Sequence, residues 1–252
     1  MQRDRCAFTA AVSGALNWDN VGLLVGDAEK EVHTVYIALD ATDETIAEAV
    51  EAGADLLLTH HPLIFKGIRQ VNSEDFVGRR VMKLIRHDIA YYAMHTNFDV
   101  AAMGTLAAER LGLWDAVVLQ ETGTAFGIGQ VGRLPREMTL SECAEHVKES
   151  FGLDQVKVFG CTEGLLQRVA VCPGSGKSVI NDALEKGAQA LITGDIDHHE
   201  GIDAVARGMA VIDAGHYGLE KIFIPYMKRY LEERQPKLTV EAQAEKQPFL
   251  YI

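Results

Sequence analysis

The sequence predicts an α/β fold of two similar lobes with mostly parallel sheets and a metal site in the cleft between them. Three observations support the fold class. Strand-like and helix-like segments alternate along the chain, as in βαβ units with right-handed crossovers. The expected strands include continuous apolar runs, typical of strands covered on both faces. The two halves of the chain also resemble each other. At 252 residues, 48% of them hydrophobic, the chain can bury a sizeable core.

The first half has the spacing of three strand–helix repeats. A β-branched segment is followed by a helical pattern with Thr42 or Asp43 as its N-cap and a glycine stop, and then by the apolar run ADLLLTHH. We expect strands at 32–40, 54–61 and 89–95, and helices at 42–53, 77–88 and 104–113.

The second half repeats this order. We expect strands at 168–174, 188–195 and 209–216, and helices at 177–187, 199–208 and 218–234. The stretch 116–167 is less regular, apart from a helix capped by Thr139. We therefore divide the chain into a first lobe, 1–115, and a second, 116–252, with the C-terminal segment 218–252 packing back on the first.

The two halves match in detail. Residues 46–62 align with 180–196 without a gap and are identical at several positions. Further on, 91–99 parallels 211–220, since each has a strand leading to a histidine and a carboxylate four residues later. All βαβ units look somewhat alike, but gapless identity around two polar turns favours duplication. Two related lobes would bring their strand ends together, where open α/β sheets place their sites.

The net charge, the apolar runs and the cysteines restrict the partners and the cellular compartment that we expect. A net charge of −12 argues against electrostatic binding of nucleic acid or anionic lipid over an extended surface. Bound metal cations could still attract an anion locally. No run approaches the ~20 apolar residues of a membrane span, and residues 1–20 lack the apolar core of a signal peptide. The four cysteines are scattered, which indicates reduced thiols. We expect a cytoplasmic protein.

Two adjacent histidines, His60 and His61, directly follow an apolar strand. Pro62 disfavours helix for His61, so the pair lies in extended backbone at the carboxyl end of the strand. Adjacent side chains in extended backbone diverge, which suits two metals ~3.5–4 Å apart better than one. The alternative is a pair of polar loop histidines.

Two further strand ends each carry a histidine and a carboxylate. They are His95 with Asp99, and His216 with Glu220. Imidazole and carboxylate ligands suit zinc, manganese, iron or nickel. Glu220 has another reading, as an acid in the first turn of a helix, and Asp99 has one as a loop acid that caps the next helix.

The segment TGDIDHHE, 193–200, is the second-half counterpart of the paired histidines. Its Asp195, Asp197, His198 and His199 could bind metal, orient a ligand or transfer protons, or simply form a polar helix-entry loop. The nearby PGSGKS is not a phosphate loop, because residue 171 is valine where that motif needs glycine. A tight turn is preferred there to an anion cradle. Cys172 is read as a small core residue.

These motifs resemble those of the GTP cyclohydrolase I type 2 homologues, the dinuclear metal centre proteins related to NGG-interacting factor three. The matching segments run through nearly the whole chain in the order of the family. They are NWDNVGLLVGD (17–27), DLLLTHHPLIF (55–65), HTNFD (95–99), ALITGDIDHHE (190–200) and IDAGHYGLEK (212–221). The resemblance departs at the N-terminus, which is shorter and lacks the proline of the first helix.

The resemblance implies that the two α/β lobes are interlocked, and it also implies a site and an assembly. Two divalent metals per chain would be bound by His60, His61, Asp99, His216 and Glu220. His95, Asp195 and His199 match positions that face the same cleft, and the acid/base candidates are His95 and His199. The family also implies a homohexameric toroid with its metal sites facing an inner cavity.

Two functions remain open from the sequence. The first is a metal-dependent hydrolase acting on a nucleotide or phosphoester, as the name GTP cyclohydrolase implies. The second is a non-catalytic metal-binding ring that binds a partner, or nucleic acid, inside its cavity.

Overall fold

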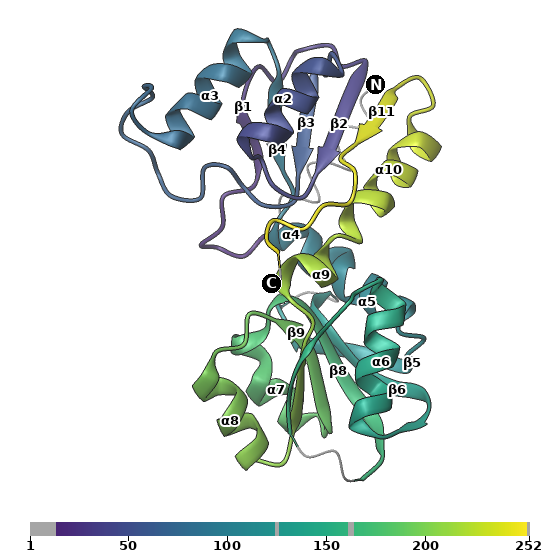
Figure 1. Ribbon diagram of the computed structural model, residues 1–252. Coiled ribbons are helices and arrows are strands. Elements are labelled where there is room, and N and C mark those ends of the chain that lie inside the picture. The colour runs from purple at the N-terminus through teal and green to yellow at the C-terminus, as the bar shows by residue number, and fades with distance from the viewer. Residues whose placement is uncertain (1–13, 124–125, 161–163, 251–252) are drawn as a thin grey trace. The chain divides into compact units, whose positions relative to one another are not determined.

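A computed structural model describes residues 14–123, 126–160 and 164–250, and it divides the chain into two compact units, each with one sheet (Figure 1). The first unit contains the described residues up to Phe98 together with Phe223–Lys246. The second contains Asp99–Ile222 and the residues from Gln247 onward. The α/β class is therefore confirmed. Residues 1–13, where the first helix of the family would lie, are outside the described part.

The first unit is built on a five-stranded sheet with the strand order β1-β4-β3-β2-β11. Strands β4, β3, β2 and β11 are parallel, and only β1 is antiparallel to its neighbour. The strands are β1 (Gly22–Val25), β2 (Thr34–Ala38), β3 (Leu56–Thr59), β4 (Ala90–Ala93) and β11 (Thr239–Ala242). The helices are α2 (Asp43–Glu51), α3 (Phe76–Arg86), α4 (Thr96–Phe98) and α10 (Phe223–Arg234).

Local sequence explains how these elements begin and pack. The side chain of Thr42 caps α2 by accepting a hydrogen bond from the Thr45 backbone N–H, so Thr42 and not Asp43 is the N-cap. Right-handed crossovers from β2 to β3 and from β3 to β4 place α2 and α3 in contact on one side of the sheet (Figure 1). Beneath them, Ile46, Leu57 and Leu84 are fully buried in the core.

The second unit contains a six-stranded mixed sheet with the order β5-β6-β8-β9-β10-β7. Strands β8, β9 and β10 form its parallel centre, and the other pairings are antiparallel. The strands are β5 (Trp114–Glu121), β6 (Gly127–Met138), β7 (Lys157–Phe159), β8 (Leu166–Ser175), β9 (Ala190–Gly194) and β10 (Ala210–Asp213). The helices are α5 (Gly104–Arg110), α6 (Leu140–Phe151), α7 (Ile180–Glu185), α8 (His198–Ala206) and α9 (His216–Glu220).

The halves that match in sequence also match in structure. In the first unit, α2 leads into β3, which pairs in parallel with β4. In the second unit, α7 leads into β9, which pairs in parallel with β10. The polar motifs follow the carboxyl ends of these four strands, so each unit places its candidate ligands at one edge of its own sheet.

The expectation of a single helix over 218–234 is wrong. The structure has two helices, α9 and α10, separated by a turn at Lys221 and Ile222. The cause is Pro225 in the first turn of α10, because proline lacks the backbone N–H that an interior helical position requires and its ring clashes with the carbonyl four residues earlier. The break coincides with the passage of the chain back into the first unit.

The less regular stretch contains three strands that the sequence reading did not predict, β5, β6 and β7. Both β5 and β6 are antiparallel and interrupted by irregularities of register, which break the alternation by which such strands are recognised. The structure divides the chain at Phe98, whereas the sequence suggested a boundary at residue 115. Residues 99–115 belong to the second unit because the π-helical turn at Asp99–Met103 and α5 pack against β6.

Two smaller expectations concern the thiols and the membrane. Cys143 and Cys172 are free and buried, while Cys6 and Cys161 lie outside the described residues. Among the helices that the structure describes, none is long and apolar enough to cross a bilayer.

Candidate metal centre

Three imidazoles cluster at the edge of the sheet in the first unit. His60 and His61 follow β3, and His95 follows the neighbouring strand β4. Each offers one nitrogen, and these three nitrogens lie within 4.8 Å of one another. His60 is fully buried, and His61 and His95 are partly buried. The cluster can hold a metal ion.

The other ring nitrogen of each imidazole is already engaged. The acceptors are the Met94 carbonyl, 2.6 Å from Nδ1 of His60; Asp40 Oδ1, 2.8 Å from Nδ1 of His61; and Asp19 Oδ1, 2.9 Å from Nδ1 of His95. A carbonyl can only accept, so His60 donates through Nδ1–H and its Nε2 carries the lone pair. Metal-binding histidines are typically oriented by such outer partners.

Asp19 is the most firmly fixed of these acceptors. Its Oδ2 accepts hydrogen bonds from the backbone N–H of Thr96 at 2.9 Å and from the Thr96 hydroxyl at 2.6 Å. Burial of Asp19 acts to raise its pKa, but the hydrogen bonds from His95 and Thr96 outweigh burial and hold the pKa well below its usual range. Asp19 is therefore a carboxylate that orients His95.

The backbone of the paired histidines is also held in place. The carbonyl of His61 accepts hydrogen bonds from the Tyr91 hydroxyl at 2.9 Å and from the Thr59 hydroxyl at 2.8 Å, and the Leu63 N–H donates to the Tyr91 oxygen at 2.8 Å. Burial raises the pKa of Tyr91 to about 12, so the phenol keeps its proton and remains a donor. This turn presents its imidazoles on a rigid support.

In the second unit, His216 and Glu220 form a corresponding pair. Nε2 of His216 lies 2.9 Å from Oε2 of Glu220, one helical turn apart in α9. Nδ1 of His216 lies 2.7 Å from Oδ2 of Asp195, which follows β9. His216 therefore resembles the imidazoles of the first unit in having an acceptor on Nδ1, while its Nε2 faces the carboxylate of Glu220.

Neither helix-terminal reading of the carboxylates is correct. Glu220 is the last residue of α9, where the helix dipole disfavours a negative charge, and it is only 3% exposed. Asp99 does not cap α5: it begins the π-helical turn before it, and the residue at the N-cap, Met103, makes no side-chain cap. Such π-helical turns are frequent at functional sites.

The glycine turn after β8 makes room for Glu220. Gly174 has a φ of +76°, and a Cβ placed there would lie 2.5 Å from Oε1 of Glu220. Nearby, Lys177 forms an ion pair with Asp197. A carboxylate packed against Gly174 would repel a phosphate at that point, so the turn is better explained as a support for Glu220 than as an anion cradle.

The donor chemistry fits divalent metals that accept nitrogen and oxygen ligands. The side chains are imidazoles together with one buried and one partly buried carboxylate, without a thiolate. Cys172 is the nearby sulfur, and burial, with the charges of Asp99 and Glu220, raises the pKa of its thiol. Cys172 therefore stays protonated, in agreement with its reading as a core residue.

The remaining sequence candidates lie apart from these groups. His199 is exposed in the first turn of α8 and packs edge-on against His198, with ring centroids 5.3 Å apart. Among the described residues, no group of candidate ligands includes His199.

The sequence analysis did not identify Asp40 and assigned no role to Asp19. Asp40 follows β2, which lies next to β3 in the parallel sheet, and this strand order is not visible in the spacing of the sequence.

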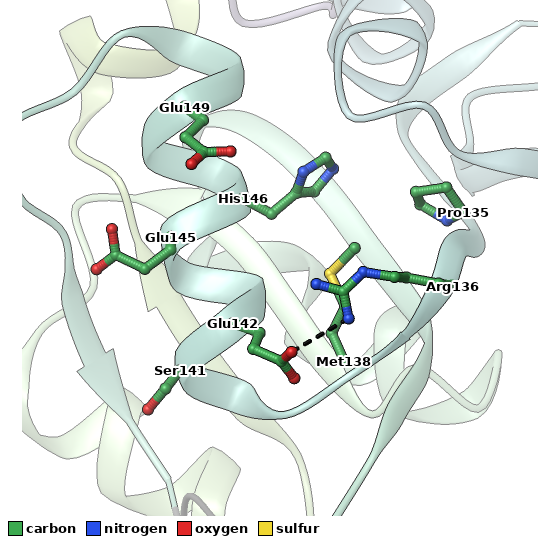
Figure 2. Close-up of a pocket in the computed structure, with 8 residues that line it drawn as sticks. All are labelled: Pro135, Arg136, Met138, Ser141, Glu142, Glu145, His146 and Glu149. Carbon is green, nitrogen blue, oxygen red and sulfur yellow. Dashed lines mark hydrogen bonds and ion pairs between the residues drawn. The ribbon is translucent and has the colours of Figure 1, made fainter.

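Away from the His216–Glu220 pair, a surface depression lies over α6 in the second unit (Figure 2). It has a volume of about 600 Å³, and its lining includes Arg136, Glu142 and His146. These side chains already have partners: Glu142 pairs with Arg136 and closes the capping box of α6, and Nε2 of His146 lies 2.9 Å from the Leu111 carbonyl. The depression contains no cluster of metal ligands.

Comparison with known proteins agrees with the motifs. The model of the Duf34/NIF3 (NGG1p interacting factor 3) family matches residues 6–248. The chain belongs to this family. Among the family's curated members, the "GTP cyclohydrolase 1 type 2 homolog" of Lactococcus lactis is 38% identical and that of Streptococcus pneumoniae 36% identical. The alignments cover 98% and 94% of this chain, and 95% and 93% of those relatives.

Solved structures of the Duf34/NIF3 fold resemble the chain over nearly its full length. The Staphylococcus aureus protein SA1388 is 30% identical with a TM-score of 0.88, covering 96% of this chain and 95% of that one. Reduced HcgD from Methanocaldococcus jannaschii is 29% identical with a TM-score of 0.83, covering 96% of both chains.

Proposed function

We propose that this Duf34/NIF3 protein is a metal-dependent hydrolase that acts on a nucleotide or phosphoester with two divalent metal ions per chain. The ligands would be His60, His61, Asp99, His216 and Glu220. The observation that carries the proposal is the common arrangement of the imidazoles, each of which is held through Nδ1 by an acceptor, as metal-binding histidines typically are.

Chain connectivity supports a single centre. The chain passes from the first unit to the second after Phe98 and returns at Phe223. Both rings pack near His60 within the first unit, with centroid distances of 6.1 Å for Phe98 and 5.2 Å for Phe223. Asp99 is the next residue after one of these rings, and Glu220 precedes the other by three. We infer that these carboxylates complete the imidazole cluster.

Two bound cations would lower the pKa of a water molecule and neutralise charge on the substrate. The chain itself would orient the groups around them. Asp19 fixes His95 through Nδ1. Nε2 of this imidazole is then the atom that would transfer a proton. His199, exposed on α8, is the second acid/base candidate.

The test compares metal content with turnover. Protein purified without chelators should contain two of zinc, manganese, iron or nickel per chain by elemental analysis, and should turn over GTP or a member of a phosphodiester panel. The double variant His60→Ala, Glu220→Ala should lose both metal and activity. His146→Ala removes an imidazole that contacts the Leu111 carbonyl in the second unit, and should keep both.

His95 is tested separately, because it could be a ligand rather than a proton-transfer group. His95→Gln should retain the metal content and lose turnover. Loss of metal in this variant would make His95 a ligand. Fully loaded wild-type protein that turns over no member of the panel would instead favour a non-catalytic metal-binding ring that binds a partner in its cavity.

We also propose a cytoplasmic location. Buried, reduced Cys143 and Cys172 support this compartment.

A further inference from the structure

Two exposed aromatic rings stand beside the imidazole cluster. Trp18 is 59% exposed and Phe65 is 48% exposed. Their ring centroids lie 5.9 Å apart, and each lies about 6 Å from the ring of His95, at 6.1 Å for Trp18 and 6.2 Å for Phe65. The His95 ring is in turn 5.3 Å from that of His60. Trp18 and Phe65 are therefore the next layer of side chains outside the candidate metal ligands.

The segment that carries Trp18 is anchored on both sides. Upstream, the Leu16 N–H donates to the Thr96 hydroxyl at 2.9 Å. Downstream, Asp19 holds His95 and Thr96, and the amide of Asn20 donates to the Ile64 carbonyl at 2.5 Å. The same residues that orient His95 thus fix the Trp18 ring beside it. Neither burial nor a hydrophobic core explains why a large ring is held in an exposed position.

The chemistry around Phe65 distinguishes among ligands. Phe65 lines a depression of about 790 Å³ formed by the 63–77 segment, and so do Lys66 and Arg69. Over the stretches of chain that the structure covers, neither cation has a carboxylate partner. Glu74 and Asp75 line the same depression, so its own charges balance, and an anionic group of the ligand would be held by the metal ions proposed for the imidazole cluster. A planar ring joined to an anionic group satisfies both features.

We propose that Trp18 and Phe65 form a stacking platform for the base of a nucleotide substrate. The proposal rests on the proposed function, because it places the base of the substrate beside the metal ligands. Aromatic side chains stack on any base through its π-face, which provides affinity without reading hydrogen bonds. The platform would make these two residues determinants of specificity for nucleotides over simple phosphoesters.

The chain allows a direct binding test, since it has two tryptophans, Trp18 and Trp114. In Trp114→Phe, the fluorescence reports on Trp18 alone. In Trp18→Phe, it reports on Trp114, which is 52% exposed in the second unit and covered by Arg133. Excitation is at the red edge of tryptophan absorption, where the base does not absorb. Guanosine 5′-monophosphate should quench Trp18 saturably and leave Trp114 unchanged, and ribose 5-phosphate should quench neither.

Affinity measurements on variants complete the test. Trp18→Ala should weaken binding of guanosine 5′-monophosphate between about fivefold and a hundredfold, the range expected for loss of base stacking. Phe65→Leu should weaken it in the same direction. Phe76→Leu is the matched control, because Phe76 is 52% exposed and lines the same depression but is covered by Arg80.

The outcomes separate this platform from the hydrolase. Saturable quenching without turnover on any substrate would retain the platform and reject the hydrolase. Turnover with equal affinity for guanosine 5′-monophosphate and ribose 5-phosphate would retain the hydrolase and overturn the platform. Equal quenching of Trp18 and Trp114 would also overturn it.

Discussion

At the scale of single residues, the defining feature is that each imidazole of the candidate centre is oriented by a second group. Asp40 and Asp19 orient His61 and His95, and Asp195 orients His216. These carboxylates hold each ring through Nδ1, as the outer partners of metal-binding histidines do. The orienting residues consequently have testable effects of their own.

Asp19→Asn should lower turnover by about 10- to 100-fold and leave the metal content unchanged, because Asp19 orients the proposed proton-transfer group and not a ligand. The amide keeps the shape of Asp19 but loses the charge that holds His95 and Thr96. Turnover assays with elemental analysis of the same sample measure the change, and loss of metal would contradict this assignment. Asp88→Asn, at a carboxylate that is 93% exposed, is the control and should behave like the unmodified protein.

Gly174 is a second residue with a specific effect. Alanine there would place its Cβ against Glu220, whereas Gly187, with a similar φ of +72°, has open space around it. Both Gly174→Ala and Gly187→Ala should lose about 1 kcal/mol of stability because alanine is strained at positive φ. Only Gly174→Ala should also lower metal affinity. Equal metal affinity of the two variants would show that the turn does not position Glu220.

At the scale of elements, strands that end in polar residues were predictable and antiparallel strands were not. The apolar runs of β3 and β9 identified the edges that carry His60, His61 and Asp195. Which strand ends are neighbours depends on strand order, so the role of Asp40 could not be read from spacing alone. The break between α9 and α10 could have been predicted from Pro225, since proline is tolerated only in the first turn of a helix.

Helix α6 provides a prediction about pH. Burial raises the pKa of Cys143 from 9.0 to about 12. The unfolded chain therefore ionises this thiol first, so its contribution to stability is complete below pH 9 and is lost as the pH rises toward 12. Between pH 8 and pH 10 the protein should lose about 1.4 kcal/mol more stability than Cys143→Ala, because one pKa unit corresponds to that free energy. Urea unfolding at both pH values measures the difference, and parallel losses would contradict it.

At the scale of the whole molecule, the similarity of the two units was predictable from the gapless match between the halves. The division of the chain was not, because it depends on contacts of residues 99–115 with β6 and on the return of the chain at Phe223. A sequence-based division places boundaries where the pattern weakens, whereas the chain changes unit inside a helical segment at Phe98 and after the turn that precedes Phe223.

The assembly remains a prediction. The family resemblance implies a homohexamer, so light scattering of the purified protein should give the mass of six chains. Dilution should not dissociate an assembly with interfaces of the size found in obligate oligomers. A monomer mass at every concentration would contradict this prediction.

The pairing of β11 with β2 has a consequence for the order of events during synthesis. The strand Thr239–Ala242 completes the edge of the sheet in the first unit, beside a strand made some two hundred residues earlier. A nascent chain on the ribosome therefore carries an incomplete first sheet, with the hydrogen-bonding edge of β2 open, until residues 239–242 have emerged. The second unit is nearly continuous in sequence and can fold before that edge is closed.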